Sequence, residues 1–275
     1  MKLARFSKMH GIGNDYIYFT EYPCHPDRLA ELARKLSDRH CGIGGDGVIL
    51  VLPSDVADFR MRIFNADGSE ARMCGNGSRC VGKLVADLGL TDKSEITLET
   101  LGGIKTLRLH RGTGSSVDSV TVEMGRALVA DPVVLKTSAG DVKVIPVDMG
   151  NPHAVVFIDC DPDEYDVHGI GRELEMNPIW PDRANVEFAK VVDPGFIKVR
   201  VWERGSGETM ACGTGACGTA AAALVTGRGG RLTTVELPGG QLEIGIDPDT
   251  MEVTMTGPAV TSFEGSVKLD LEGTH

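Results

Sequence analysis

Two glycine-rich segments of the sequence each place one cysteine directly before a run of residues that predicts a helix. The segment DGSEARMCGNGSRCVGK at 67–83 contains Cys74, and the segment GSGETMACGTGACG at 205–218 contains Cys212. The first turn of a helix presents unpaired backbone N–H groups and the positive end of the helix dipole, and both stabilise anions. We therefore expect each helix start to lower the pKa of its thiol and to leave a site for a carboxylate beside it.

The two cysteine segments belong to an internal duplication. Cys74 and Cys212 are 138 residues apart, and the same offset aligns FRMRIF at 59–64 with IKVRVW at 197–202. A repeat of this length predicts two domains of similar fold. We expect one domain to comprise residues 1–124 with about 259–275 and to carry Cys74. The other domain would comprise residues 125–258 and carry Cys212.

The elements that must position these cysteines follow from hydrophobic periodicity. After Pro26, the spacing of Leu29, Leu32, Ala33 and Leu36 predicts a helix to about residue 38. Further helices are predicted at about 76–88, 164–173 and 214–225. Strands are predicted at 3–9, 16–20, 48–52, 59–64, 95–99, 104–110, 119–124, 143–149, 154–158, 185–192 and 197–202, and further strands follow the last helix up to Met255. The fold class is therefore α/β of the α+β type, with a mostly antiparallel sheet wrapped around a central helix in each domain.

One glycine cluster superficially resembles a dinucleotide-binding loop. The run GIGGDG at 42–47 is followed by VILVL, which predicts a strand. A dinucleotide loop requires a helix at that place, so the sequence argues against a nucleotide site here.

Composition restricts the class of protein. The 275 residues carry a formal net charge of -11 without a block of Lys or Arg, which argues against a nucleic-acid partner. No apolar run approaches the roughly 20 residues that span a bilayer. The N-terminal segment is interrupted too early for a signal peptide, so we expect a cytoplasmic protein that does not bind membranes. Seven cysteines at irregular spacing favour free thiols over a disulfide framework.

Two equivalent thiols suggest a reaction. If the duplicated domains bring both helix starts to one cleft, one thiolate can remove a proton from a carbon while the other thiol returns a proton to the opposite face. This is racemase chemistry, and helix N–H groups would stabilise the neighbouring carboxylate. The alternatives are a structural role for each cysteine and zinc ligation with Cys80 or Cys217, whose spacing is not the usual one for zinc. We expect Cys80 and Cys217 in the core and no metal site.

Polar residues at turns and strand ends are candidate substrate ligands. They are Asn14, Asn65, Asn151, Asn185, Glu203 and Arg204. Each alone is typical of a turn. Together they favour a substrate with several ammonium and carboxylate groups, and Arg204 suits bidentate pairing with a carboxylate. His153 either biases the charge state of a thiol or caps the turn after Asn-Pro, and both interpretations stay open.

With these residues in view, the chain resembles the diaminopimelate epimerases nearly end to end. The resemblance rests on KMHGIGND at 8–15, FNADGSEARMCGNGSRC at 64–80, MGNPHAV at 149–155, ANVEF at 184–188 and ERGSGETMACGTGAC at 203–217. It implies two pseudo-symmetric domains and an isomerase that interconverts LL-2,6-diaminopimelate and the meso form without a cofactor. The lysine and peptidoglycan-precursor pathway uses this reaction.

The resemblance also implies residue roles. Cys74 would donate the proton and Cys212 accept it in one direction, with the roles exchanged in reverse. The reacting carboxylate would bind to Gly75, Asn76, Gly213 and Thr214. The other amine and carboxylate groups would bind to Asn14, Asn65, Asn151, Asn185, Glu203 and Arg204. His153 and Glu203 would tune the pKa values of the thiols.

Two positions differ from some members of that family. Gly47 stands where some members carry a substrate-contacting Gln, so we assign it no role. Phe263 stands where some members have a Tyr at a dimer interface, and we expect a homodimer.

Two other functions compete with this assignment. One is an isomerase of the same fold that acts on proline-like or aromatic substrates, and the number of distal polar ligands argues against it. The other is an amino-acid-binding protein without catalysis, and the presence of both thiols argues against that.

Overall fold

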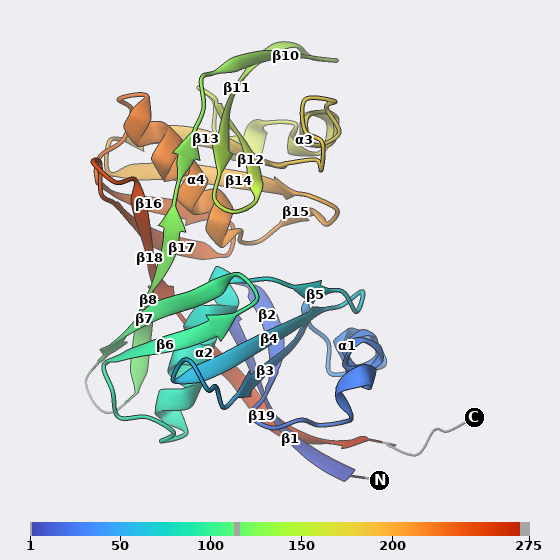
Figure 1. Ribbon diagram of the computed structural model, residues 1–275. Coiled ribbons are helices and arrows are strands. Elements are labelled where there is room, and N and C mark those ends of the chain that lie inside the picture. The colour runs from blue at the N-terminus through green and yellow to red at the C-terminus, as the bar shows by residue number, and fades with distance from the viewer. Residues whose placement is uncertain (1, 113–115, 270–275) are drawn as a thin grey trace. The chain divides into compact units, whose positions relative to one another are not determined.

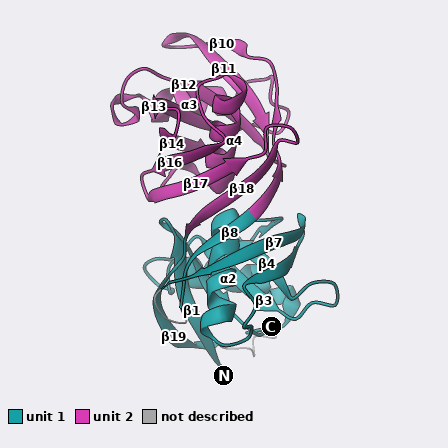
Figure 2. Cartoon of the chain, turned by 90° about the vertical axis from the view of Figure 1, so that its left-hand side faces the viewer, with its two compact units in different colours: residues 1–122, 258–275 teal, residues 123–257 magenta. Residues whose placement is uncertain are grey.

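The structure is a computed structural model that describes residues 2–112 and 116–269 (Figure 1). It divides into two compact units (Figure 2). Unit 1 comprises Met1–Val122 and Pro258–His275, and unit 2 comprises Glu123–Gly257. The boundaries expected from sequence lie at 124/125 and about 258/259. Residues 270–275 of the expected first domain lie outside the described residues.

Unit 1 is built on a mixed sheet in which most neighbouring strands are antiparallel. Its strands are β1 (Lys2–Gly11), β2 (Asn14–Phe19), β3 (Gly47–Leu52), β4 (Phe59–Asn65), β5 (Glu70–Ala71), β6 (Glu95–Thr100), β7 (Gly103–Arg111), β8 (Val117–Arg126) and β19 (Val260–Leu269). They pair in the order β19–β1–β2–β3–β4–β6–β7–β8, with β5 also beside β4. The pairs β2–β3 and β4–β6 are parallel. Strand β19, from the end of the chain, pairs with β1 from residue 2 to residue 10.

Helix α2 (Gly75–Asp87) is the central helix of unit 1, and strands surround it in Figure 2. Its residues are buried nearly all round, and Cys80, Val81 and Val85 have no exposed surface. Three glycines within its thirteen residues weaken its intrinsic helix propensity. Its stability therefore comes from packing against the sheet. The helix ends at Asp87, and Leu88 is its C-cap. Gly89 follows in the left-handed region at φ +68.

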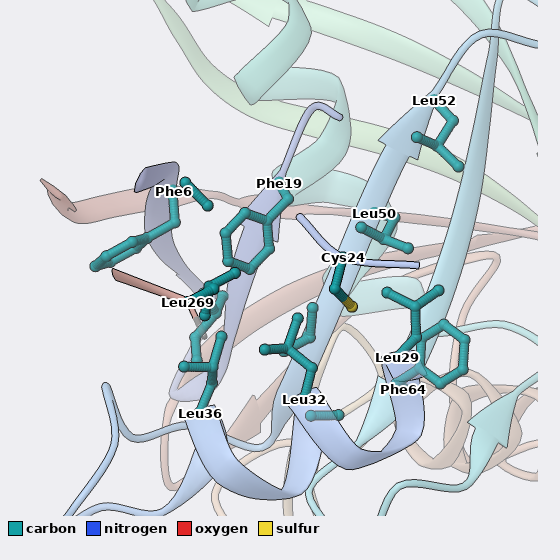
Figure 3. Packing of buried hydrophobic residues seen from close by; sticks show 14 residues of the cluster. Phe6, Phe19, Cys24, Leu29, Leu32, Leu36, Leu50, Leu52, Phe64 and Leu269 are labelled. Carbon is teal, nitrogen blue, oxygen red and sulfur yellow. The ribbon is translucent and has the colours of Figure 1, made fainter. Parts of the chain in front are cut away.

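Helix α1 (Leu29–Ser37) covers the other face of the sheet in unit 1. The predicted stripe of Leu29, Leu32, Ala33 and Leu36 is buried in one apolar cluster. Figure 3 shows its three leucines together with Phe19, Leu50 and other residues of that cluster. Strand β3 is buried along its whole length because α1 covers one face and α2 the other. The stripe is confirmed, but the helix is not continuous from Pro26, since Pro26–Arg28 forms a separate 3₁₀ turn.

Unit 2 repeats the architecture of unit 1. Its strands are β9 (Leu128–Val129), β10 (Val133–Thr137), β11 (Gly140–Asp148), β12 (Pro152–Phe157), β13 (Asn185–Asp193), β14 (Phe196–Glu203), β15 (Gly207–Thr209), β16 (Leu232–Leu237), β17 (Gly240–Ile246) and β18 (Glu252–Pro258). They pair in the order β10–β11–β12–β13–β14–β16–β17–β18, and β12–β13 and β14–β16 are the parallel pairs. The register also repeats, because Val48 faces Phe64 and Val186 faces Trp202. The predicted duplication and fold class are confirmed.

Helix α4 (Gly213–Val225) takes the place of α2 in unit 2, and α3 (Val167–Glu175) takes the place of α1. The side chains of Ala220–Ala223 have no exposed surface, and their small size allows strands to approach the helix closely. The helix expected at about 164–173 begins later. Residues Pro162–Glu164 form a 3₁₀ turn, and Tyr165 is extended. The Asp166 carboxylate then caps α3 by accepting from Gly169 N at 2.9 Å.

Candidate active site

Cys74 occupies the N-cap of α2, as the glycine-bounded segment predicts. Its backbone is extended, and its Sγ accepts a hydrogen bond from Gly77 N at 3.3 Å. Its carbonyl oxygen accepts from Ser78 N at 2.8 Å and from Ser78 Oγ at 2.9 Å. The thiol is therefore fixed over the first turn of α2, where the backbone N–H groups of Gly75 and Asn76 lie.

Asn14 orients the thiol of Cys74 from the first position of β2. Cys74 Sγ donates to Asn14 Oδ1 at 3.4 Å, while Asn14 Nδ2 donates to Asp46 Oδ2 at 2.8 Å. The same Asp46 oxygen accepts from Asp15 N at 3.0 Å, so the direction of the Asn14 amide is fixed. Burial raises the pKa of the Asp46 carboxyl. Sequence reasoning missed Asp46, although an acidic residue inside a glycine loop was the available signal.

The other two asparagines of unit 1 make internal hydrogen bonds. Asn65 accepts from Tyr16 Oη at 3.3 Å and donates to Ser69 Oγ at 3.1 Å. Asn76 is buried, and its Oδ1 accepts from Nη1 of the buried Arg79 at 2.9 Å. The side chain of Asn76 is thus directed into the unit. A contact between Asn76 and a carboxylate would use its backbone N–H group.

Gly47 has a structural reason to be glycine. A Cβ at this position would lie 2.2 Å from the backbone oxygen of Phe64 and 2.8 Å from Cε1 of Tyr16. A larger residue would have to displace β4, so in this chain position 47 offers no side chain to a substrate.

Cys212 occupies the N-cap of α4 with the same geometry as Cys74. Its Sγ accepts from Gly215 N at 3.3 Å and lies 3.6 Å from Thr214 Oγ1. The expected lowering of the thiol pKa is wrong for Cys212. Burial, then Glu203 and Glu187, raise the pKa of this thiol well above 9.0. The cost of burying a charge and the two nearby carboxylates outweigh the hydrogen bonds and the helix end that favour a thiolate.

A chain of hydrogen bonds leads from α4 to β13 in unit 2. Asn151 Nδ2 donates to Thr214 Oγ1 at 3.3 Å, and Asn151 Oδ1 lies 3.1 Å from His153 Nε2. His153 Nδ1 lies 2.7 Å from Glu187 Oε1, and both side chains are completely buried. The structure therefore brings Asn151, His153 and Thr214 together behind Cys212. Sequence reasoning missed Glu187, although an acidic residue within a predicted apolar strand was a signal.

Asn185, Arg204 and Glu203 lie where β13 starts and β14 ends. Asn185 Oδ1 accepts from Arg204 N at 3.0 Å, and Asn185 Nδ2 donates to Pro152 O at 3.2 Å. The exposed Arg204 side chain donates from Nη1 to Asp182 O at 2.8 Å. Glu203 accepts from Thr209 Oγ1, and its charge acts on Cys212.

The remaining cysteines take no part in these two clusters. Cys80 and Cys217 are fully buried in α2 and α4, which confirms their placement in the core. None of the seven cysteines forms a disulfide. Within residues 2–112 and 116–269, no group of three or more His, Cys, Asp or Glu side chains is arranged to hold a metal ion. Among those same residues, no helix has the length and apolar character to cross a membrane.

Comparison with solved structures gives the fold. A PhzF-family phenazine biosynthesis protein of Bacillus anthracis covers 98% of this chain and 100% of its own, with a TM-score of 0.76 at 18% identity. A hydroxyproline epimerase from Agrobacterium vitis covers 98% of this chain and 93% of its own, with a TM-score of 0.76 at 20% identity. At these identities the likeness concerns architecture alone.

Comparison of sequences gives the family. Diaminopimelate epimerase of Phocaeicola vulgatus is 49% identical, over 96% of this chain and 98% of the relative. Diaminopimelate epimerase of Bacteroides thetaiotaomicron is 50% identical, over 96% of this chain and 98% of the relative. The family model described as diaminopimelate epimerase matches residues 6–130 and 145–262, which include both N-cap cysteines. The chain belongs to the diaminopimelate epimerase family.

Proposed function

We propose that this protein interconverts LL-2,6-diaminopimelate and meso-2,6-diaminopimelate by proton transfer between two thiols, without a cofactor. The reaction serves the lysine and peptidoglycan-precursor pathway. The observation that carries the proposal is the repeated N-cap geometry, in which Cys74 and Cys212 each accept a hydrogen bond from the N–H three residues later. Membership of the family supports the choice of substrate.

The proposed reaction exchanges one C–H bond for another. One cysteine, as thiolate, takes the proton from the α-carbon, and the electron pair of the broken C–H bond is delocalised into the neighbouring carboxylate. The other cysteine, as thiol, gives its proton to the opposite face of the same carbon. Each turnover leaves the two cysteines with exchanged protonation states. The catalysis therefore requires both thiols to reach one α-carbon when substrate is bound.

The first turns of α2 and α4 would stabilise the intermediate. Negative charge increases on the reacting carboxylate, and preorganised backbone N–H groups stabilise such charge more strongly in the transition state than in the ground state. We assign this role to Gly75, Asn76, Gly213 and Thr214. A carboxylate at a helix start also gains from the helix dipole.

The distal end of diaminopimelate carries a second ammonium and a second carboxylate. We propose that these groups and the reacting amine bind to Asn14, Asn65, Asn151, Asn185, Glu203 and Arg204. The guanidinium of Arg204 is exposed, and the backbone N–H of Arg204 is held by Asn185. Both observations support pairing of this side chain with a carboxylate. Glu203 and His153 are assigned to the tuning of the thiols, which the effect of Glu203 on Cys212 supports.

We further propose that units 1 and 2 act as the two catalytic domains and that the protein is a cytoplasmic homodimer. Free cysteines throughout the chain support a reducing compartment. The exposed apolar residues Leu3, Val260 and Phe263 on β1 and β19 support an interface on this pair of strands. Light scattering of the purified protein should give twice the chain mass, and a monomer at micromolar concentration contradicts the dimer.

One experiment tests the reaction and its independence of cofactors together. Reduced protein, freed of metals and pyridoxal phosphate, is incubated with LL-diaminopimelate in heavy water, with proline as a control substrate. We expect deuterium at an α-carbon together with meso product, and no exchange in proline. Binding of diaminopimelate without deuterium incorporation, in protein whose thiols titrate as free, contradicts the proposal.

A further inference from the structure

A buried carboxylate lies next to Cys212, and its bonding is incomplete. Glu187 on β13 has no exposed surface, and its Oε2 has no hydrogen-bond partner. A Cβ placed on Gly215 would lie 2.6 Å from Glu187 Oε1 and 3.2 Å from Cys212 Sγ. Glu187 Oε1 and Cys212 Sγ therefore both lie beside Gly215, whose lack of a side chain leaves room for them. Burying an ionisable pair and leaving one carboxylate oxygen without a partner is costly, so the presence of Glu187 calls for a reason other than packing.

The hydrogen bonds around His153 define how its protons are arranged. Asn151 donates from Nδ2 to Thr214, so its Oδ1 is the atom that faces His153 Nε2, and Nε2 must carry a proton. The 2.7 Å contact between His153 Nδ1 and Glu187 Oε1 then holds one more proton. The pair has no net charge whether that proton is on nitrogen or on oxygen.

Unit 1 supplies an internal comparison for this arrangement. The repeated register places Ile49 of β3 at the position of Glu187, and Tyr16 of β2 at the position of His153. A Cβ on Gly77 would lie 2.7 Å from Ile49 Cδ1, which repeats the contact of Gly215 with Glu187. The fold thus accepts an apolar side chain at this position, and the ionisable pair is a property of the Cys212 half-site alone.

The charged groups that act on Cys212 come from neighbouring strands. Glu203 of β14 and Glu187 of β13 raise the pKa of the thiol, after burial, and His153 of β12 is bonded to Glu187. Other ionisable side chains on the strands against α4 are exposed or half-exposed. They include Asp141, Lys143 and Asp148 of β11, Lys190 and Asp193 of β13, Lys198 and Arg200 of β14, Glu236 of β16 and Glu243 of β17. Glu187 is therefore the fully buried carboxyl side chain beside this thiol.

We propose that Glu187 is a positioning residue for the proton transfer at Cys212, which orients the His153 ring and keeps Cys212 protonated until substrate binds. When Cys212 becomes a thiolate, the shared proton can move from His153 Nδ1 to Glu187 Oε1. The N–H bond breaks, the O–H bond forms, and the negative charge beside the sulfur is removed without a change in the charge of the pair. The proposal rests on the proposed function for its use in catalysis, but the state of the thiol can be tested without substrate.

The test is the pH dependence of alkylation of Cys212 in Glu187→Gln. Iodoacetamide reacts with the thiolate, and mass spectrometry of peptides reports Cys74 and Cys212 separately in the same sample. Removal of the Glu187 carboxylate, which raises the pKa of this thiol, should move the Cys212 midpoint at least about one unit toward lower pH. The Cys74 midpoint should stay in place. The pH profile of kcat for epimerisation should shift in the same direction, while KM changes less than about twofold.

Two further variants serve as controls. Glu236→Gln removes a carboxylate from the same unit on β16 and should leave both midpoints unchanged. Glu187→Ile copies the residue that unit 1 holds at this position, so it tests the charge if Glu187→Gln does not fold. An unshifted Cys212 midpoint in a folded Glu187 variant overturns the proposal. If the midpoint shifts in the Glu187 variant but the wild-type protein fails to exchange deuterium into diaminopimelate, the effect of Glu187 on the thiol is retained and the epimerase function is rejected.

Discussion

The two thiols hold equivalent positions but have different neighbours. Cys74 donates to Asn14, whose amide is fixed by Asp46, whereas Cys212 lies beside carboxylates in a buried place. We infer that each thiol serves one face of the substrate and cannot replace the other. Sequence reasoning identified both cysteines but predicted a lowered pKa for each, because helix ends are visible in sequence and the burial of Cys212 is not.

Replacing either thiol should therefore stop epimerisation. In Cys74→Ser and in Cys212→Ser, one face loses its acid–base group, and we expect turnover to fall about 10²- to 10⁴-fold. The fold should remain, since a Ser hydroxyl can also accept the hydrogen bond at an N-cap. Formation of meso product from the LL isomer measures the effect, and circular dichroism checks the fold. Exposed Cys160→Ser is the control, and wild-type turnover in both site variants contradicts two-thiol chemistry.

The buried thiol of Cys80 should make the protein less stable in alkaline solution. Burial raises the pKa of Cys80 to about 11, from a usual value near 9.0. As pH rises from about 9 to 11, the unfolded chain loses this proton before the folded chain does. The free energy of unfolding should then fall by about 2 kcal/mol over this range. Urea unfolding at several pH values gives the free energy of unfolding as a function of pH. Its slope against pH should be flatter in Cys80→Ala than in wild type and unchanged in the control Cys160→Ala. Equal slopes in wild type and Cys80→Ala would contradict the effect.

At the scale of elements, the two central helices tolerate added side chains differently. A Cβ on Gly218 of α4 would lie 3.6 Å from its nearest neighbours, which is ordinary contact. A Cβ on Gly82 of α2 would lie 2.8 Å from Leu109 Cδ2 and 3.3 Å from Val120 Cγ1. Position 218 of α4 can thus accept a methyl group, whereas position 82 of α2 cannot do so without a shift of its neighbours.

Gly218→Ala should accordingly stabilise the protein. Alanine gains about 0.5–1 kcal/mol over glycine inside a helix, because it loses less backbone entropy on folding. In Gly82→Ala the same gain is opposed by overpacking that costs about 1–3 kcal/mol. Thermal unfolding should give a higher midpoint for Gly218→Ala and a lower one for Gly82→Ala. Midpoints that shift equally would contradict this difference between positions 218 and 82.

The sequence predicts most of the longer elements, but it misses the ten-residue strand β19 and the short strands. The alternation in 59–64 and the helical spacing of Leu29, Leu32, Ala33 and Leu36 are strong signals because each reports a buried face. Strands β5 and β15, which precede the cysteines, have two and three residues and leave no periodic pattern. The roles of Asp46 and Glu187 also escaped prediction, since they depend on which residues meet after folding.

At the scale of the whole chain, unit 1 is assembled from both ends of the sequence. Strand β19 pairs with β1 over nine residue positions of β1, and Leu269 belongs to the apolar cluster under α1 (Figure 3). Phe263 also packs edge-on against Phe6, with ring centroids 6.0 Å apart. Unit 2 is continuous in sequence and contains none of these residues. The two units should therefore respond differently to a loss of the C-terminal strand.

A chain that stops after Pro258 should lose the stability of unit 1 and keep that of unit 2. Without β19, the backbone N–H and C=O groups of β1 lack their partners, and an unpaired apolar edge favours aggregation. We expect native-state hydrogen exchange to show lost protection in β1–β4 and α2, with protection retained in β12, β13 and α4. A chain that stops after Leu269 keeps all of β19 and serves as the control, with exchange like that of the full chain. Retained protection of β1 in the shorter chain would show that unit 1 does not depend on its C-terminal strand.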